Sequence, residues 1–179
     1  NPDEINYVTI GSVTEGSVEN VETIPYEEAP SRAQRIVKHG DVIWTKVRPN
    51  LKSYALILDP VPNMIVSTGF AVITPRQLPY TYLYHALTTE RFVDHLTKLA
   101  TGAAYPAVRV RDFEDARVLR PTEDVLESFH RFVANLYAER EILHQKNEVL
   151  RLTRDLLLPR LVSGELDVSS LDVSTGGSL

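Results

Sequence analysis

A short basic segment carries the side chains with the clearest chemistry in this sequence. They alternate around a proline-containing turn and comprise Lys46, Arg48, Asn50 and Lys52. An arginine can donate two hydrogen bonds to a guanine edge and an asparagine can exchange two with an adenine, whereas a lysine more readily meets a phosphate. At the tip of a hairpin, these residues could contact nucleic acid. A solvated basic hairpin is the alternative interpretation.

Two small loops add candidates for the same chemistry. Thr68-Gly69 and Thr101-Gly102 each contain a glycine, which lets backbone amides approach a phosphate, although ordinary turn formation explains them equally well. Three side chains after the second loop could reach a groove: Tyr105, Arg109 and Arg111. Arg111-Asp112 could instead form an internal ion pair. We expect Trp44 to belong to the core.

The distribution of charge decides whether such a surface is feasible. The net charge of −5 argues against a polyanionic partner if it is spread evenly. However, residues 1–30 carry seven acidic residues and no lysine or arginine, whereas residues 31–54 carry six lysines and arginines and one acid, Asp41. The chain can therefore present a basic surface locally while it stays acidic overall.

The elements that must position these residues follow from residue type and periodicity. β-branched and aromatic residues predict strands over 7–10, 41–47, 53–58 and 70–74. Apolar residues at helical spacing predict a helix over 79–99. We also expect a short helix over 27–37, ended by Gly40 in the left-handed conformation, and a stretch over 108–120 that completes the sheet. These elements indicate an α+β fold: a compact mixed α/β domain with a twisted sheet and short helices.

A long helix follows this domain. No glycine or proline occurs between Thr122 and Pro159, a run that would make a helix about 55 Å long. Apolar residues recur every seven positions at Phe129, Leu136, Leu143, Leu150 and Leu157, beside a second row at Ile142, Val149 and Leu156. This heptad pattern predicts a coiled-coil helix that pairs with another helix, whereas an amphipathic helix packed on its own domain is the alternative. We divide the chain into a domain over 1–120, a long helix over 121–160 and a partly flexible segment over 161–179.

Several classes of protein are disfavoured by what the sequence lacks. It has no cysteine, which disfavours disulfides and thiol chemistry and suits the cytoplasm. No stretch is long and apolar enough to cross a membrane, and no signal peptide or catalytic fingerprint is recognisable. The five histidines are scattered, so we expect no metal and no cofactor. The absence of an initial methionine suggests a fragment or a trimmed chain.

Three stretches together resemble the DNA-specificity subunits of type I restriction–modification systems. The first is YVTIGSV at 7–13, and the second runs from GDVIWTKVRP at 40–49 to VSTGF at 66–70. The third runs from Thr101-Gly102 through RDF at 111–113 and closes with LLLPRLVSGEL at 156–166. Their order and spacing cover nearly the whole chain, and the closing stretch is the most distinctive.

The resemblance implies a specific division of labour. Such a subunit has no catalytic centre and selects double-stranded DNA for methyltransferase subunits and, indirectly, for the restriction subunit. Each target-recognition domain reads one half of a split target, while spacer helices set the distance between domains and dock the methyltransferase. Family members usually carry two domains and two spacer helices. One of each implies either half of a longer subunit or a half-length subunit that pairs with a second copy.

Two other classes remain as rivals. The first is a coiled-coil adaptor whose globular domain binds protein without DNA specificity, which fits the acidic balance. The second is a hydrolytic enzyme, which the missing motifs disfavour. Indifference to any DNA would favour the adaptor, and a deep acidic pocket with a bound metal would favour the enzyme.

Overall fold

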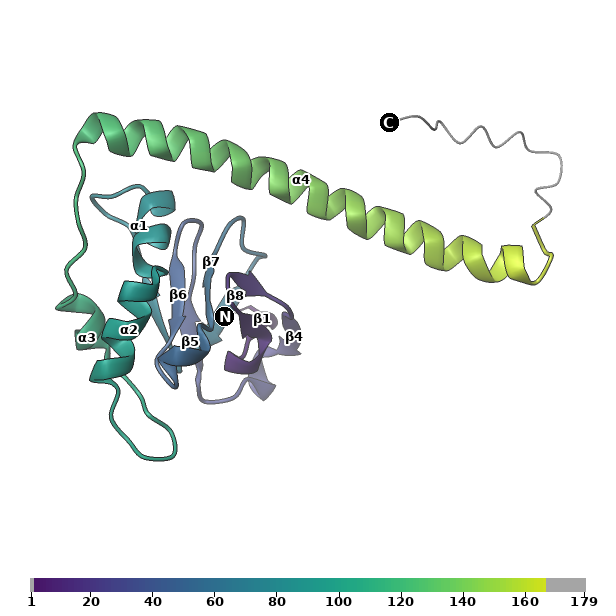
Figure 1. Cartoon of the computed structure of the whole chain (residues 1–179). Coiled ribbons are helices and arrows are strands. Elements are labelled where there is room, and N and C mark those ends of the chain that lie inside the picture. Colours follow the sequence, from purple (N-terminus) through teal and green to yellow (C-terminus); the bar gives the residue numbers. More distant parts are fainter. Residues whose placement is uncertain (1, 167–179) are drawn as a thin grey trace. The chain divides into compact units, whose positions relative to one another are not determined.

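The structure is a computed structural model that describes residues 2–166 (Figure 1). Contacts between residues divide the chain into two units, Asn1–Val133 and Ala134–Leu179. The division falls inside the long helix α4 (Glu123–Val162). Among the described residues, the first unit holds the strands and the short helices, and the second holds the remaining turns of α4. The α+β class predicted from the sequence is confirmed.

A mixed four-stranded sheet forms one layer of the first unit, in the order β4-β1-β8-β5. Its strands are β1 (Glu4–Val8), β4 (Glu22–Pro25), β5 (Ala33–Ile36) and β8 (Met64–Ser67). β1 runs parallel to β8 and antiparallel to β4, whereas β5 pairs antiparallel with β8. The basic segment therefore enters the domain on an edge strand of this sheet.

A second sheet of three antiparallel strands carries the predicted hairpin, in the order β7-β6-β9. Its strands are β6 (Val42–Thr45), β7 (Tyr54–Leu56) and β9 (Phe70–Ile73). All four residues of the central strand β6 are buried. Because side chains alternate between the two faces of a strand, both faces of β6 must be covered. A short hairpin of β2 (Val13–Thr14) and β3 (Ser17–Val18) lies beside β7.

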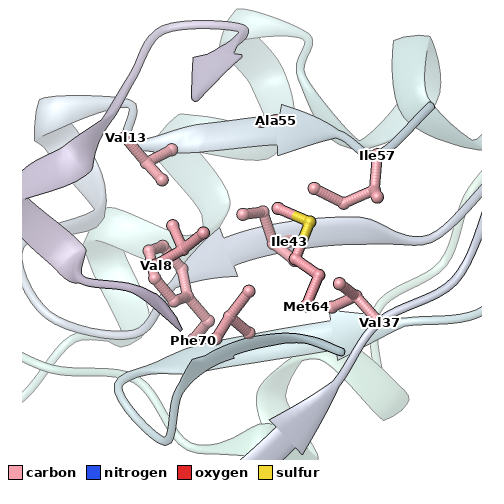
Figure 2. Close-up of a cluster of buried hydrophobic side chains, with 9 residues drawn as sticks. Val8, Val13, Val37, Ile43, Ala55, Ile57, Met64 and Phe70 are labelled. Atoms are coloured by element: carbon pink, nitrogen blue, oxygen red, sulfur yellow. The ribbon is translucent and has the colours of Figure 1, made fainter. Parts of the chain in front are cut away.

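One face of β6 contributes to an apolar core shared by the two sheets. The core comprises Val8, Val13, Val37, Ile43, Ala55, Ile57, Met64, Val66 and Phe70. Figure 2 shows side chains from strands of both sheets pointing toward one another. Burial of each larger side chain contributes about 1.5–3 kcal/mol, so this core stabilises the packing of the two sheets.

The other face of β6 is covered by helices. Trp44 is fully buried, and its Nε1–H donates to the carbonyl of Leu87 (3.1 Å) at the end of α1 (Tyr80–Leu87). Its ring centroid lies 4.9 Å from that of Tyr54 and 6.3 Å from that of Phe92 in the next helix. Trp44 is thus a core residue, as predicted.

Several sequence predictions are confirmed with adjusted bounds. The strands expected over 41–47, 53–58 and 70–74 are β6, β7 and β9, and β1 lies earlier than the predicted 7–10. The helix expected over 79–99 is interrupted, because Thr89 Oγ1 accepts a hydrogen bond from Phe92 N–H (3.3 Å) and starts α2 (Glu90–Leu99). The residues therefore form two consecutive helices.

Two other predictions are wrong. The segment 27–37 is not a helix: a 3-10 turn (Tyr26–Glu28) precedes the edge strand β5, whose backbone bonds come from β8. Gly40 has the expected positive φ, 85°, but follows a strand. The stretch 108–120 does not complete the sheet; it forms α3 (Val110–Glu114), because the Asp112 carboxylate caps the N-terminus. The sequence reasoning also missed β8.

Helix α4 begins in the first unit. Leu126 and Val133 are 0% and 8% exposed, so these early turns belong to the core of that unit. The predicted domain boundary at 120/121 stays a prediction, and most of the C-terminal segment 161–179 lies outside the described residues. Within residues 2–166, no helix combines the length and the apolarity that a membrane span demands.

Candidate nucleic-acid interface

The connection between β6 and β7 holds the basic residues in an unusual backbone conformation. The hairpin is antiparallel, with Trp44 opposite Tyr54, and its loop contains a 3-10 turn (Pro49–Leu51). Arg48 and Lys52, which flank this turn, have φ of 51° and 54°. Each left-handed non-glycine residue costs about 1–2 kcal/mol, so the surroundings must over-determine this loop.

A second loop, residues 101–107, supplies part of that support. Arg48 N–H donates to the carbonyl of Pro106 (2.7 Å), and Val108 N–H donates to the carbonyl of Lys46 (2.9 Å). The loop is closed on itself by two backbone bonds between Thr101 and Ala107 (3.0 and 2.9 Å). Two loops that are far apart in the sequence are therefore joined by backbone hydrogen bonds, and we call them the loop pair.

The side chain of Arg48 lies across this second loop. Its Nη2 donates to the carbonyl of Ala104 (3.1 Å), and its Cζ lies 4.7 Å from the centroid of the Tyr105 ring. Both residues are exposed, with 69% of Tyr105 accessible. The guanidinium is thus held over an aromatic ring and stays in contact with solvent.

The β8–β9 turn connects the loop pair to β5. Thr68 N–H donates to the carbonyl of Arg32 (2.8 Å), and Lys46 N–H donates to the carbonyl of Gly69 (2.9 Å). The backbone bonds therefore place five cations on neighbouring segments, which we call the basic strip: Arg32, Arg35, Lys46, Arg48 and Arg109. Arg32 and Arg35 were counted in the basic segment of the sequence but were not among its predicted contact residues.

The basic strip is not neutralised from within. Among residues 2–166, no member of the strip forms an ion pair with a carboxylate. Asp41, the one acid in the basic segment, is 2% exposed and accepts hydrogen bonds from Lys38 N–H (3.0 Å) and Thr74 Oγ1 (2.7 Å). Its carboxylate is therefore held inside, and the cations of the strip stay available for an external anion.

Lys46 shows the electrostatic consequence. Its side chain is half-buried, and this burial lowers the pKa of Lys46, since desolvation disfavours the ammonium. The nearby charge of Arg35 lowers the pKa further. Two cations close together in a partly desolvated place are stabilised by an anion such as a phosphate.

Lys52 behaves differently from the other predicted contact residues. Its ammonium pairs with the carboxylates of Glu15 (3.6 Å) and Glu90, and the hydrogen bond to Glu90 is the main cause that raises the pKa of Lys52. Tyr54 Oη also donates to Glu15 (3.1 Å), and burial raises the pKa of this phenol. The charge of Lys52 is thus engaged within the protein, where it anchors the end of the loop.

The two candidate glycines are explained by packing and turn geometry. A Cβ on Gly69 would lie 2.2 Å from Ile10 Cδ1, and the Gly69 N–H already meets Ser67 Oγ (3.2 Å). Gly102 has φ of 116°, and a Cβ there would lie 3.0 Å from the carbonyl oxygen of Tyr105. The amides of Thr68 and Thr101 also have backbone acceptors. These contacts favour the turn interpretation over amides that meet phosphate.

The remaining candidates lie around α3 and the 3-10 turn. Asp112 accepts a hydrogen bond from Arg109 N–H (2.6 Å), and the carboxylate that pairs with Arg111 is that of Asp115 (3.2 Å). The Arg111–Asp115 pair is highly exposed, so it contributes little and leaves Arg111 accessible. Asn50 is exposed on the 3-10 turn.

The predicted helix-pairing residues divide into two groups. Phe129 packs within the first unit, with its ring 5.9 Å from Tyr82 and 5.7 Å from His85. The other four are 48, 52, 65 and 41% exposed in chain order: Leu136, Leu143, Leu150 and Leu157. The second row is equally open, with Ile142, Val149 and Leu156 at 53, 62 and 71%.

These features define a class of protein: a mixed α+β domain with an unneutralised basic strip, joined to a long helix that exposes two apolar rows. No family model matches the chain. Over 138 residues it is 28% identical to the type I restriction enzyme MjaIX specificity subunit of Methanocaldococcus jannaschii, covering 76% of this chain and 32% of that protein. The HindI specificity subunit of Haemophilus influenzae is 28% identical over 69 residues, or 38% of this chain and 15% of the relative.

Solved structures extend this likeness to the fold. The HsdS subunit of Thermoanaerobacter tengcongensis superimposes with a TM-score of 0.62 at 27% identity, covering 98% of this chain and 45% of that one. A chain from a structure of the type I R-M system gives 0.61 at 28% identity over the same shares. The chain is therefore similar in sequence and in fold to type I specificity subunits. It spans less than half the length of these relatives.

Proposed function

We propose that this chain is the sequence-specific DNA-recognition part of a type I restriction–modification complex. The observation that carries the proposal is the basic strip, because its cations lack carboxylate partners and lie on segments tied by backbone bonds. Similarity to specificity subunits supports the same function. The chain carries out no catalysis in this proposal; it directs methyltransferase and endonuclease subunits to a split target in the cytoplasm.

The basic strip also explains how a chain with a net negative charge can bind a polyanion. The field near the surface depends on the local arrangement of charges, so a strip without carboxylates attracts phosphates even where the net charge is −5. Lys46 is the best-placed phosphate contact, since its charge is only partly hydrated and lies near Arg35. Contacts of this kind position the domain on the duplex but carry no sequence information.

The hairpin tip is the part of the surface suited to reading bases. Arg48 and Asn50 are exposed there and have side chains that can form paired hydrogen bonds with base edges in the major groove. Arg109 and Arg111 follow Val108, whose N–H is bound to the carbonyl of Lys46, and are further proposed contacts. We remove Lys52 from the contact set because Glu15 and Glu90 hold its ammonium.

The exposed rows of α4 supply the proposed contacts with other proteins. Four leucines at heptad spacing are 41–65% exposed in the single chain. Burying such side chains against another helix releases about 25 cal/mol per Å² of apolar surface. We propose that they pair with a second specificity half or a second copy and dock the methyltransferase subunits, which in turn recruit the restriction subunit.

DNA binding by the full chain tests this function. Duplexes selected from a random pool should share a sequence, and affinity for that sequence should exceed affinity for a scrambled duplex at several salt concentrations. Each phosphate contact contributes about −0.9 to the slope of log affinity against log salt, so Arg35→Ala and Lys46→Ala should each reduce the slope by about 1.

A matched control is Arg117→Ala, since Arg117 is an exposed arginine that lines a separate cleft with Tyr82 and Leu119. This variant should keep the wild-type slope and sequence preference. Equal affinity for selected and scrambled duplexes would contradict sequence-specific recognition. Indifference to all DNA would point instead to the adaptor class.

A further inference from the structure

We infer that Arg48 reads one guanine in the major groove and that Tyr105 is the positioning residue which holds its guanidinium for that contact. The inference rests on the proposed DNA-recognition function and adds to it the identity of one base and a role for the 101–107 loop. Its basis is the loop pair, which has the stacked side chains of Arg48 and Tyr105 at its exposed surface.

The backbone of the loop pair leaves Arg48 little conformational freedom. Its N–H is bound to the carbonyl of Pro106 (2.7 Å), while its φ of 51° lies in the region that L-residues avoid. On the far side of the 3-10 turn, the ion pairs of Lys52 with Glu15 and Glu90 hold the other end of the loop. Strained backbone that the surroundings over-determine is typical of recognition sites, where it prepares the bound conformation.

The side chain is held in the same way. The Tyr105 ring supports the guanidinium from one face at 4.7 Å, and the carbonyl of Ala104 accepts from Nη2 at 3.1 Å. An arginine side chain loses rotamer entropy when it becomes fixed, and here part of that cost is met before DNA binds. Preorganisation of this kind raises both affinity and selectivity.

The remaining donors of Arg48 match one base. A guanidinium has five N–H donors and two edges that can each donate a pair of parallel hydrogen bonds. Both edges include Nη2, which has one N–H on each, so the single bond to Ala104 leaves one paired edge free. Among residues 2–166, no carboxylate forms an ion pair with Arg48 and competes for that edge.

A free edge with two donors needs two adjacent acceptors. In the major groove guanine presents N7 and O6, both acceptors. Adenine places an amino donor beside N7, cytosine presents an amino donor, and thymine presents one carbonyl beside a methyl group. Donor-only Arg48 therefore favours guanine over the other three bases.

The experiment compares the sequence preferences of variants of the full chain. Selection of duplexes from a random pool identifies the half-site of the wild type, and the same selection is repeated with Arg48→Ala, Arg48→Lys, Tyr105→Ala and Tyr105→Phe. Arg48→Ala should lose preference for guanine at one position by about 5- to 150-fold, the fold-change that corresponds to 1–3 kcal/mol. Arg48→Lys should lose the same preference and keep salt-dependent binding, because it retains the charge without the fork.

The tyrosine variants separate positioning from a general structural role. Tyr105→Ala should weaken the preference at that same position by about two- to five-fold, as expected for loss of an exposed cation–π contact. Tyr105→Phe keeps the ring and should therefore keep the wild-type preference at that position. In the double variant Arg48→Ala/Tyr105→Ala, the second change should have no further effect on guanine preference. The control Arg117→Ala should leave every position unchanged.

A chemical probe identifies the base atom. Replacing the selected guanine with 7-deazaguanine removes the N7 acceptor, which should weaken binding by the wild type and leave Arg48→Ala unaffected. If a sequence is selected but Arg48→Ala changes no guanine, or Tyr105→Ala alters all positions equally, the inference fails and the proposed function stands. If no sequence is selected, both fail.

Discussion

The two units of the chain differ in where they place apolar surface. The first unit encloses its large side chains, and Trp44, Phe70 and Leu96 are each 0% exposed. In the part of the second unit that the structure describes, Leu143 and Leu150 keep more than half of their surface open. Because exposed apolar surface forgoes the free energy of burial, the first unit gains this energy within a single chain, whereas the second would gain it only against another surface, as we propose.

The two units also differ in whether their arginines pair with carboxylates. In the part of the second unit that the structure describes, three of the four arginines pair with nearby carboxylates: Arg151–Glu148 (3.2 Å), Arg154–Asp155 (2.7 Å) and Arg160–Glu165 (3.2 Å). The first unit leaves the basic strip without such partners. This difference is the one that the proposed function requires: a domain that meets an anion and a helix that meets an apolar protein surface.

The sharpest contrast between the units should appear in stability. Trp44→Ala removes the largest buried side chain and its hydrogen bond to Leu87, and should lower the free energy of unfolding by about 3–5 kcal/mol. Leu150→Ala should change it by about 0.5 kcal/mol or less in the single chain. Urea denaturation followed by circular dichroism, at protein concentrations that favour single chains, measures both. Similar losses in the two variants would mean that α4 has an intramolecular partner.

Self-association examines the second unit directly. The double variant Leu143→Asp/Leu150→Asp places charges on the exposed apolar row and should weaken association of the full chain by about 100-fold or more, since each buried leucine contributes about 1.5–3 kcal/mol. Sedimentation velocity over a concentration series provides the measurement. Gln145→Asp, which lies in neither row, is the control and should associate normally. A monomeric wild type at every concentration would argue against pairing between copies.

A smaller effect tests why position 69 is a glycine. Gly69→Ala should destabilise the first unit by about 1–3 kcal/mol, because its Cβ would lie 2.2 Å from Ile10 Cδ1. In an Ile10→Ala background the clashing atoms are gone, so the same change should cost much less. Thermal unfolding of the four chains gives the double-mutant cycle. Additive losses would contradict the packing explanation, and loss of DNA affinity at unchanged stability would restore a phosphate role for Gly69.

The local elements near the hairpin could be predicted because their signals are local. β-branched and aromatic residues on either side of a proline-containing turn indicate β6 and β7, and the heptad repeat indicates α4. Trp44 could be assigned to the core on residue type alone. The α+β class and the likeness to specificity subunits also followed from patterns along the chain.

The errors arose where backbone partners come from distant sequence. β5 is an edge strand with mostly exposed side chains, so it shows no clear alternation, and its hydrogen bonds depend on β8, about thirty residues later. Without that pairing, Arg35 could not be placed near Lys46, nor Arg32 beside the β8–β9 turn. In the same way, Lys52 looked like a free cation until the fold brought Glu15 and Glu90 to it.

By itself, therefore, the sequence determined which side chains are available: a basic segment, an apolar core, and a helix with two open apolar rows. Only the tertiary structure decided which cations remain free and which are neutralised, and that the 101–107 loop supports Arg48. The physical reason is that residue type and spacing set local conformation, whereas electrostatic partners depend on distances between segments that only folding brings together.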